Sequence, residues 1–146
     1  MNGLLQIPGT CVNIRRMTKN ILAFLAFVSL SVFAAAASSH IADISQTDLQ
    51  AAIASKSVVL LDVNGSDSYN DGHIPGAIDF DAHQKDIASL LPADKTALVV
   101  AYCGNEHCPA YKRGAEAAVA LGYTNVKHFA PGIYGWKKSG APTEKK

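Results

Sequence analysis

Two cysteines five positions apart are the side chains best suited to chemistry in this sequence. Cys103 follows an apolar run, residues 97–102, and Cys108 precedes Pro109 and an alanine-rich stretch, residues 110–121. This order predicts a buried strand, a short loop and a helix, which would gather backbone N–H groups around the first cysteine. A thiol in such a position has a lowered pKa and can act as a nucleophile. The sequence therefore predicts reactive sulfur chemistry at Cys103.

The segments around the cysteines alternate between strand and helix patterns. Continuous apolar runs predict strands at residues 58–63 and 97–102, and shorter strands are expected at residues 77–80, 126–129 and 40–44. Helical segments are expected at residues 45–55, 66–70, 84–91, 110–121 and 133–138, with Ser45 as the N-cap of the first. This alternation indicates an α/β fold whose central sheet is mostly parallel, has four to five strands and carries helices on both faces. Active sites in such sheets form at the carboxyl ends of strands, where Cys103 is expected to lie.

The first 37 residues have the pattern of a secretory signal peptide. Three basic residues precede the apolar run of residues 21–37, and small residues follow as a cleavage site, with Met17 as an alternative start. An uncleaved membrane anchor is the alternative, but the run is short for a spanning helix. We therefore expect a periplasmic or secreted protein that is not stably associated with a membrane after cleavage.

Residues 38–146 are expected to form a single domain. They hold all 12 acidic residues and 10 of the 13 basic residues, so their net charge is −2. This balance argues against a nucleic-acid partner, which would require a basic surface. Cys103 and Cys108 are the only cysteines of this segment. Two cysteines so close together do not frame a fold, so apolar packing must form the core.

Three segments together resemble the rhodanese family of sulfurtransferase domains, over about residues 43–142. The first segment joins residues 60–63 (LLDV) to residues 72–77 (GHIPGA), and the second is the Cys103 loop between its strand and helix. The third segment contains residues 121–126 (LGYTNV), 131–136 (PGIYGW) and 140–142 (GAP).

The resemblance implies a compact α/β domain in which Cys103 accepts sulfur. In that family the cysteine thiolate attacks a sulfane sulfur, becomes a persulfide and passes the sulfur to a second nucleophile. The partners would be a small sulfur-containing substrate or a thiol acceptor, and neither a metal nor an organic cofactor is implied. The backbone N–H groups of the loop would hold the persulfide, which assigns substrate binding to Gly104, Asn105, Glu106, His107 and Cys108.

The sequence departs from the family pattern at two positions. Many active members have an arginine where this chain has Cys108, and many have another where it has Asn64, two residues after the strand aspartate. Without a loop arginine the site lacks a bidentate clamp for anions. The Glu106 carboxylate would also raise the pKa of the thiol, and His107 offsets this only when protonated. We therefore expect weak thiosulfate activity, or none.

Cys108 supports a second hypothesis, in which the chain is a thiol redox protein. Cys108 could act as a resolving thiol that attacks an oxidised or persulfidated Cys103 and closes a disulfide. This requires Cα atoms within about 7 Å, and a loop wrapped around a central anion can hold them farther apart. A third hypothesis is a non-enzymatic binding module in which the cysteine is incidental. The sequence leaves the oligomeric state and the pairing of the two cysteines open.

Other residues of these motifs are expected to have structural roles. His73 would fix a turn by hydrogen bonding. Asp62 could orient the backbone near the site, but a structural role is expected for it. Trp136 and Tyr134 would pack in the core or at its rim. Lys112 and Arg113 would be solvated surface side chains or add positive potential near the loop.

Overall fold

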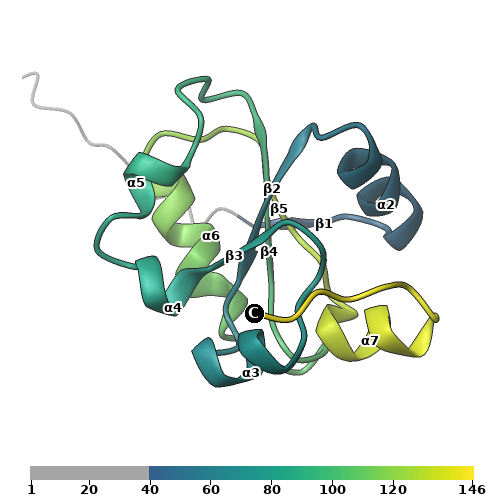
Figure 1. Ribbon diagram of the computed structural model, residues 1–146. Helices are drawn as coiled ribbons and strands as arrows, with labels where there is room; N and C mark the ends of the chain where they lie inside the picture. The colour runs from purple at the N-terminus through teal and green to yellow at the C-terminus, as the bar shows by residue number, and fades with distance from the viewer. Residues whose placement is uncertain (1–39) are drawn as a thin grey trace, which may run out of the picture. The chain divides into compact units, whose positions relative to one another are not determined.

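The computed structural model describes residues 40–146, which form one five-stranded parallel sheet (Figure 1). The strands are β1 (Ala42–Asp43), β2 (Val58–Asp62), β3 (Ala77–Asp79), β4 (Leu98–Tyr102) and β5 (Val126–His128), in the order β1-β5-β4-β2-β3. The predicted signal peptide, residues 1–37 with Met17, lies outside the described residues. Within residues 40–146, no helix has the length and apolar character needed to span a membrane.

Helices cover both faces of the sheet (Figure 1). One face carries α2 (Gln46–Ala54), α3 (Ser66–Asp71) and α7 (Gly132–Lys138), and the other carries α4 (Phe80–His83), α5 (Ile87–Leu90) and α6 (Tyr111–Ala120). Since successive side chains of a strand point to opposite faces, the two central strands feed two separate cores. Leu60, Val100 and Tyr102 pack on the α2 and α7 side, whereas Leu61 and Ala101 pack on the α6 side. The predicted α/β fold is confirmed.

Most predicted elements lie within one or two residues of the observed ones, and the exception lies between β3 and β4. The helix predicted at residues 84–91 is wrong as a single element, because two short helices, α4 and α5, occupy residues 80–90. The side chain of Asp79 accepts a hydrogen bond from the Ala82 N–H at 3.1 Å, so it caps α4 directly after β3. Phe80, predicted to end the strand, is therefore the first residue of a helix, with its side chain buried.

The C-terminal segment is tied to the turn between α3 and β3. His73 and Glu144 exchange backbone hydrogen bonds of 2.9 and 3.0 Å, and the Glu144 carboxylate accepts the Gly76 N–H at 3.0 Å. The imidazole of His73 is buried, stacks on Tyr69 and contacts the Tyr69 carbonyl oxygen through Nδ1 at 2.8 Å. His73 thus fixes this turn, as the sequence predicts.

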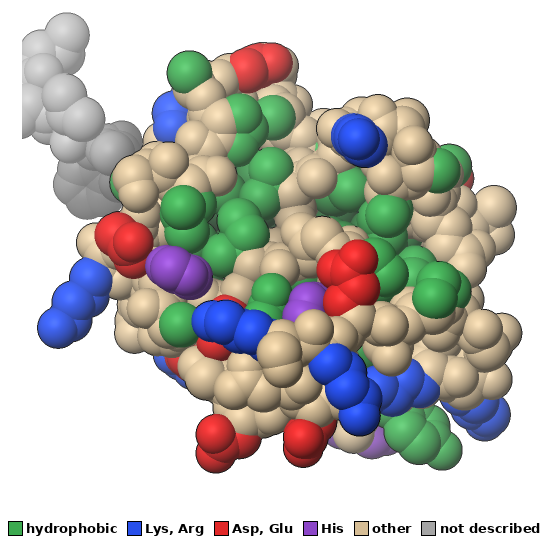
Figure 2. All heavy atoms as spheres, in the orientation of Figure 1, with side chains coloured by type: hydrophobic (Ala, Val, Ile, Leu, Met, Phe, Trp, Pro, Cys, Tyr) green, Lys and Arg blue, Asp and Glu red, His purple; other side chains and the backbone are tan. Residues whose placement is uncertain are grey.

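Two surface hollows lie at the amino end of β2. They have volumes of about 450 and 370 Å³, and both include Lys56 and Val58 in their linings. Figure 2 shows hydrophobic side chains gathered on this face between α5 and α2. Neither hollow is lined by the cysteines, which lie at the opposite, carboxyl end of the sheet.

Candidate functional site

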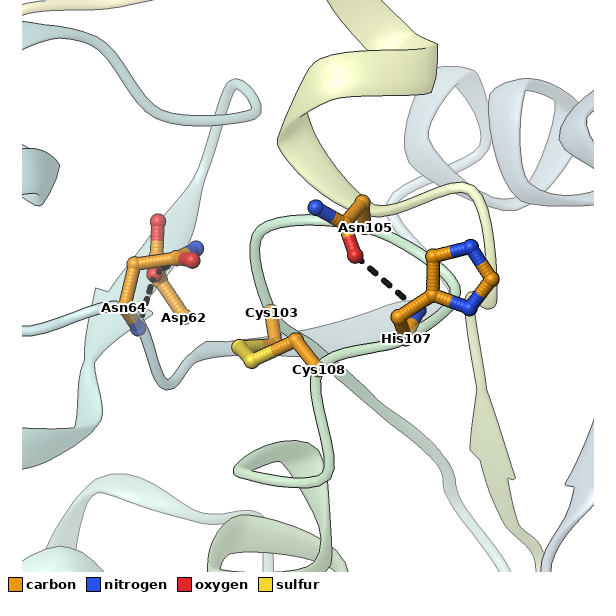
Figure 3. Close-up of a disulfide and its surroundings, with 6 residues drawn as sticks. All are labelled: Asp62, Asn64, Cys103, Asn105, His107 and Cys108. Atoms are coloured by element: carbon orange, nitrogen blue, oxygen red, sulfur yellow. Dashed lines mark hydrogen bonds between the residues drawn. A yellow bond between two sulfur atoms is a disulfide. The ribbon is translucent and has the colours of Figure 1, made fainter.

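The candidate site lies where β4, the middle strand of the sheet, ends. Cys103 directly follows Tyr102, the last residue of β4, and is only 3% exposed. Its Sγ forms a disulfide with Cys108 (Figure 3). The Cα atoms of the two cysteines lie 6.1 Å apart. This separation is within the ordinary range for a disulfide. The cysteine loop, residues 103–108, is thus a closed ring in this structure.

Asn105 folds the cysteine loop back on itself. Its side-chain Oδ1 accepts the His107 N–H at 2.9 Å (Figure 3), and its backbone carbonyl accepts the Cys108 N–H at 3.1 Å. This tight turn returns the chain toward Cys103. It also occupies two of the N–H groups that the sequence assigned to substrate binding. Within residues 40–146, the N–H groups of Gly104, Asn105 and Glu106 make no hydrogen bond to another residue.

The first residues of α7 hold the other side of the loop. The N–H groups of Ile133 and Tyr134 donate to the carbonyls of Cys103 and Gly104, both at 2.9 Å. Gly132 makes this approach possible, because a Cβ at its position would lie 2.4 Å from the Cys103 carbonyl oxygen. Its φ of +59° is also one that side chains disfavour. Gly132 therefore sets how closely α7 contacts the loop.

The adjacent strand, β2, ends at Asp62, whose carboxylate is hydrogen-bonded. Asp62 is 2% exposed, and its Oδ1 accepts the backbone N–H and the side-chain amide of Asn64, at 2.9 and 2.8 Å. Its Oδ2 accepts the Tyr102 hydroxyl at 2.7 Å, and that hydroxyl accepts the Ile74 N–H at 3.0 Å. Asp62 therefore has the structural role that the sequence predicts. Burial of the phenol and the nearby Asp62 carboxylate raise the pKa of Tyr102, so the phenol stays protonated and keeps donating.

Asn64 lies between this carboxylate and the cysteine loop. A Cβ on Gly104 would lie 3.4 Å from Asn64 Oδ1, so the amide oxygen faces the loop while its nitrogen binds Asp62. Asn64 occupies the position at which the rhodanese resemblance implies an arginine in many proteins. The amide of Asn64 donates a hydrogen bond to Asp62 but brings no positive charge to the loop.

Several ionisable side chains near the loop contact one another in pairs. Glu106 and His107 contact each other at 3.5 Å, and both are largely exposed to solvent. Arg113 is paired with Asp81 and lies over the ring of Phe80, so it is a bound surface cation rather than one aimed at the loop. Among residues 40–146, no group of three or more His, Cys, Asp or Glu side chains is arranged to hold a metal ion.

A buried histidine lies at the end of β5, the strand on the other side of β4. His128 is 5% exposed, stacks on Tyr111 of α6 with ring centroids 3.5 Å apart, and contacts Asp43 through Nδ1 at 3.0 Å. Its Nε2 is buried and has no partner within the described residues. Desolvation lowers the pKa of His128 below its ordinary value, against the opposing effect of Asp43.

The structure brings the residues named from the sequence together and adds others. Cys103 through Cys108 share one loop, and Pro109 lies in the turn before α6. Trp136 packs in the core, but Tyr134 is 64% exposed. Gly132 and the N–H groups of α7 were missed as loop-holding elements, although the Pro131-Gly132 pair marks a turn at that place.

Comparison with proteins of known structure supports the fold. A 20% identical protein from Lactobacillus plantarum matches 90% of this chain and 98% of its own, with a TM-score of 0.60. A rhodanese-like domain from Anabaena, 24% identical, matches 71% of this chain and 79% of its own, with a TM-score of 0.56. A thiosulfate sulfurtransferase from Pseudomonas aeruginosa, also 24% identical and with a TM-score of 0.56, matches 73% of this chain but 20% of its own length. These similarities establish the fold.

Two sequence comparisons bear on the family. An HTH-type transcriptional regulator from Mycobacterium tuberculosis is 33% identical over 88 residues, which is 60% of this chain but 38% of the regulator. The family model described as the rhodanese-like domain matches residues 45–139, which include every described strand except β1, together with the whole cysteine loop. The chain belongs to the rhodanese-like domain family.

Proposed function

We propose that this chain is a sulfurtransferase-type protein that carries sulfane sulfur as a persulfide on Cys103. The observation that carries this proposal is the position of Cys103 at the carboxyl end of the middle strand of a parallel sheet, where α7 holds the carbonyls of the loop. Parallel sheets place their active sites at this edge. With the carbonyls of Cys103 and Gly104 bound by α7, the N–H groups that follow are free to face an anion.

The charges around the loop are a reason to expect only weak activity with thiosulfate. Thiosulfate is a dianion, and at the loop it would meet the exposed Glu106 carboxylate without an opposing loop arginine. A donor without a sulfonate group, such as inorganic polysulfide or a persulfide on another thiol, depends less on such an arginine. A thiosulfate:cyanide assay should therefore show little turnover, and turnover equal to that of arginine-containing relatives would contradict the proposal.

Mass spectrometry of the reduced chain tests the assignment of Cys103. After incubation with inorganic polysulfide, the peptide that contains the cysteine loop should gain one sulfur atom. Cys103→Ser should abolish this gain, because serine cannot form a persulfide. If the Cys103→Ser peptide still gains the sulfur, the carrier is a different residue and the proposal fails.

The disulfide favours a second candidate, a thiol redox protein that uses Cys103 and Cys108. Both sulfurs are within bonding reach, and such a pair can alternate between dithiol and disulfide with a thiol partner. Equilibration in buffers of defined glutathione ratio, followed by alkylation, would measure this couple. A chain that cycles readily but never gains sulfur would favour the redox function over sulfur transfer.

The compartment proposed for this chemistry is the periplasm or the extracellular space. The pattern of residues 1–37 supports export, and a stable disulfide is typical of oxidising compartments. The mass of the protein recovered from the producing cell tests this. A chain that retains residues 1–37 and remains in the cytoplasm would contradict it.

A further inference from the structure

The disulfide in the cysteine loop suggests how a sulfur atom would leave the protein. The Sγ atoms of Cys103 and Cys108 are bonded, so the loop can bring the second thiol to the inner sulfur of a persulfide carried by the first. Asn105 favours this approach, because both of its acceptors hold the end of the loop that carries Cys108.

We infer that Cys108 releases sulfide from a Cys103 persulfide by closing this disulfide, which makes the chain a sulfide-releasing enzyme rather than only a sulfur carrier. The inference rests on the proposed function, because it requires that Cys103 first acquires the sulfur. It assigns Cys108 a catalytic role as the resolving nucleophile. The disulfide form described here is then the product of one turnover.

The reaction balances without an outside oxidant. The Cys108 thiolate attacks the inner sulfur of the Cys103 persulfide, so the bond between the two Sγ atoms forms while the bond to the outer sulfur breaks. The outer sulfur leaves with the bonding electron pair as hydrosulfide, and the Cys108 thiol proton passes to the solvent. The sulfane sulfur is reduced to sulfide, and the two cysteine sulfurs are oxidised to the disulfide.

Cys108 could attack either sulfur of the persulfide, and only attack on the inner sulfur leads directly to the disulfide. Attack on the outer sulfur would move the persulfide to Cys108 and leave Cys103 as a thiol, whereas attack on the inner sulfur gives the Sγ–Sγ bond that the structure contains. The hydrogen bonds from α7 hold Cys103 in place during this step, because its carbonyl and that of Gly104 are fixed.

Burial determines how the loop would be reopened for the next turnover. Cys103 is 3% exposed, whereas Cys108 is half-buried, so a thiol reductant reaches the Cys108 sulfur more easily. Attack there forms a mixed disulfide on Cys108 and frees Cys103 as the leaving thiolate. Each sulfide released therefore consumes one equivalent of a dithiol, or two of a monothiol, in reopening the loop. In the closed form Cys103 has no thiol, so it takes up no sulfur until a reductant acts.

A timed loading experiment on the full chain tests the inference. The reduced chain, freed of reductant without oxygen, is mixed with inorganic polysulfide and quenched with an alkylating agent at successive times. The mass of the peptide that contains the cysteine loop and the sulfide released are followed together, against a donor-only control. Release is expressed per chain loaded with sulfur, so that differences in loading among variants do not enter.

The wild-type peptide should pass from persulfide to disulfide with release of one sulfide per chain. The Cys108→Ser peptide should keep the extra sulfur and release sulfide about 100-fold more slowly, since it loses an intramolecular nucleophile. Cys108→Ala should behave in the same way, and this second variant guards against a folding defect specific to serine.

The outcomes separate this inference from the proposed function. If either Cys108 variant releases sulfide as fast as the wild type, or if the wild type keeps its persulfide, the inference is wrong and the persulfide proposal stands. If wild-type disulfide forms without sulfide above the donor-only control, the inference is also wrong. If neither Cys108 variant gains sulfur while both remain folded, Cys103 is not the carrier and both proposals fail.

Discussion

The ends of β2 and β4 are neighbours in the sheet, yet they are held in opposite ways. Asp62 and Tyr102 are paired in register, and the carboxylate of Asp62 is bound by three hydrogen-bond donors in a buried network. One residue farther, the end of β4 is held by a covalent bond that a thiol can open and by two hydrogen bonds from α7. The difference indicates that the end of β2 is fixed by a buried hydrogen-bond network, whereas the cysteine loop after β4 can change between disulfide and dithiol. The loop can therefore be oxidised or reduced without disturbing the strand that supports it.

The largest predicted effect on the cysteine loop is that of Gly132→Ala. The added Cβ would lie 2.4 Å from the Cys103 carbonyl oxygen and 2.7 Å from the Gly104 carbonyl carbon, both of which are backbone atoms that cannot move cheaply. Displacing the loop by about 1 Å should slow persulfide formation on Cys103 by about 100-fold. The rate of sulfur gain by mass spectrometry measures this.

Gly140→Ala provides the matched control. Gly140 also has a positive φ, +78°, but a Cβ there would meet no atom within 4 Å. It shares the backbone strain without the contact, so its sulfur loading should match the wild type. Equal losses in the two variants would show that strain in the glycine conformation, and not the approach of α7 to the loop, controls the site.

Tyr102→Phe tests the buried hydrogen-bond network around Asp62. It removes the donor to Asp62 and leaves the Ile74 N–H without its acceptor in a buried place, so the free energy of unfolding should fall by about 1–3 kcal/mol. Urea unfolding of the oxidised protein measures this. Tyr69→Phe, which removes one hydrogen bond to the Ala77 carbonyl at a half-buried site, should cost less. If Tyr102→Phe also changes the reactivity of the two cysteines toward alkylation, the two strand ends are not independent.

Asn105→Ala should have a smaller effect, on the closing of the loop. It removes the acceptor of the His107 N–H, which helps to fold the loop toward Cys103, and one such hydrogen bond contributes about 0.5–1.5 kcal/mol. The ratio of disulfide to dithiol in a glutathione buffer should therefore fall by about 5-fold, which corresponds to about 1 kcal/mol. Asn105→Asp keeps an acceptor at this position and should restore most of the ratio. An unchanged ratio in Asn105→Ala would show that the backbone alone forms the turn.

The smallest predicted effect lies at the third strand end, on β5. Because the folded protein lowers the pKa of His128, the unfolded chain takes up this proton first as the pH falls. The contribution of His128 to stability is present above its ordinary pKa of about 6.5 and is lost as the pH falls toward the lower, folded value. The free energy of unfolding should therefore decrease between about pH 7 and about pH 5. His128→Phe keeps a ring against Tyr111 but cannot titrate, so it should flatten this slope. An equal slope in both proteins would assign the pH dependence to other groups.

The sequence allowed the sheet to be predicted because its central strands are apolar on both faces. Val58–Asp62 and Leu98–Tyr102 face two helical layers, so their apolar runs are continuous and hard to mistake. The region between β3 and β4 was harder. There Asp79 ends a strand and caps a helix at once, and neither short helix is long enough to show a period.

The residues of the candidate site could be predicted from the sequence, but its disulfide and its hydrogen bonds to α7 could not. The strand, loop and helix around Cys103 follow from local sequence. The pairing with Cys108 depends on how closely the two Cα atoms approach, and α7, far along the chain, holds the loop through hydrogen bonds to backbone carbonyls. Such contacts leave no mark in the side-chain types of the loop, which is why the spacing alone left the pair open.

The hold of α7 on the loop has a mechanical consequence. The Tyr134 N–H donates to Gly104 while the ring of the same residue projects into solvent, with 64% of its surface exposed. The backbone beside the Cys103 sulfur and an outward-facing aromatic ring are thus joined through one hydrogen bond. A molecule that binds this ring would therefore contact the same helical turn that holds the backbone beside the sulfur, and Gly132 keeps that turn against the loop.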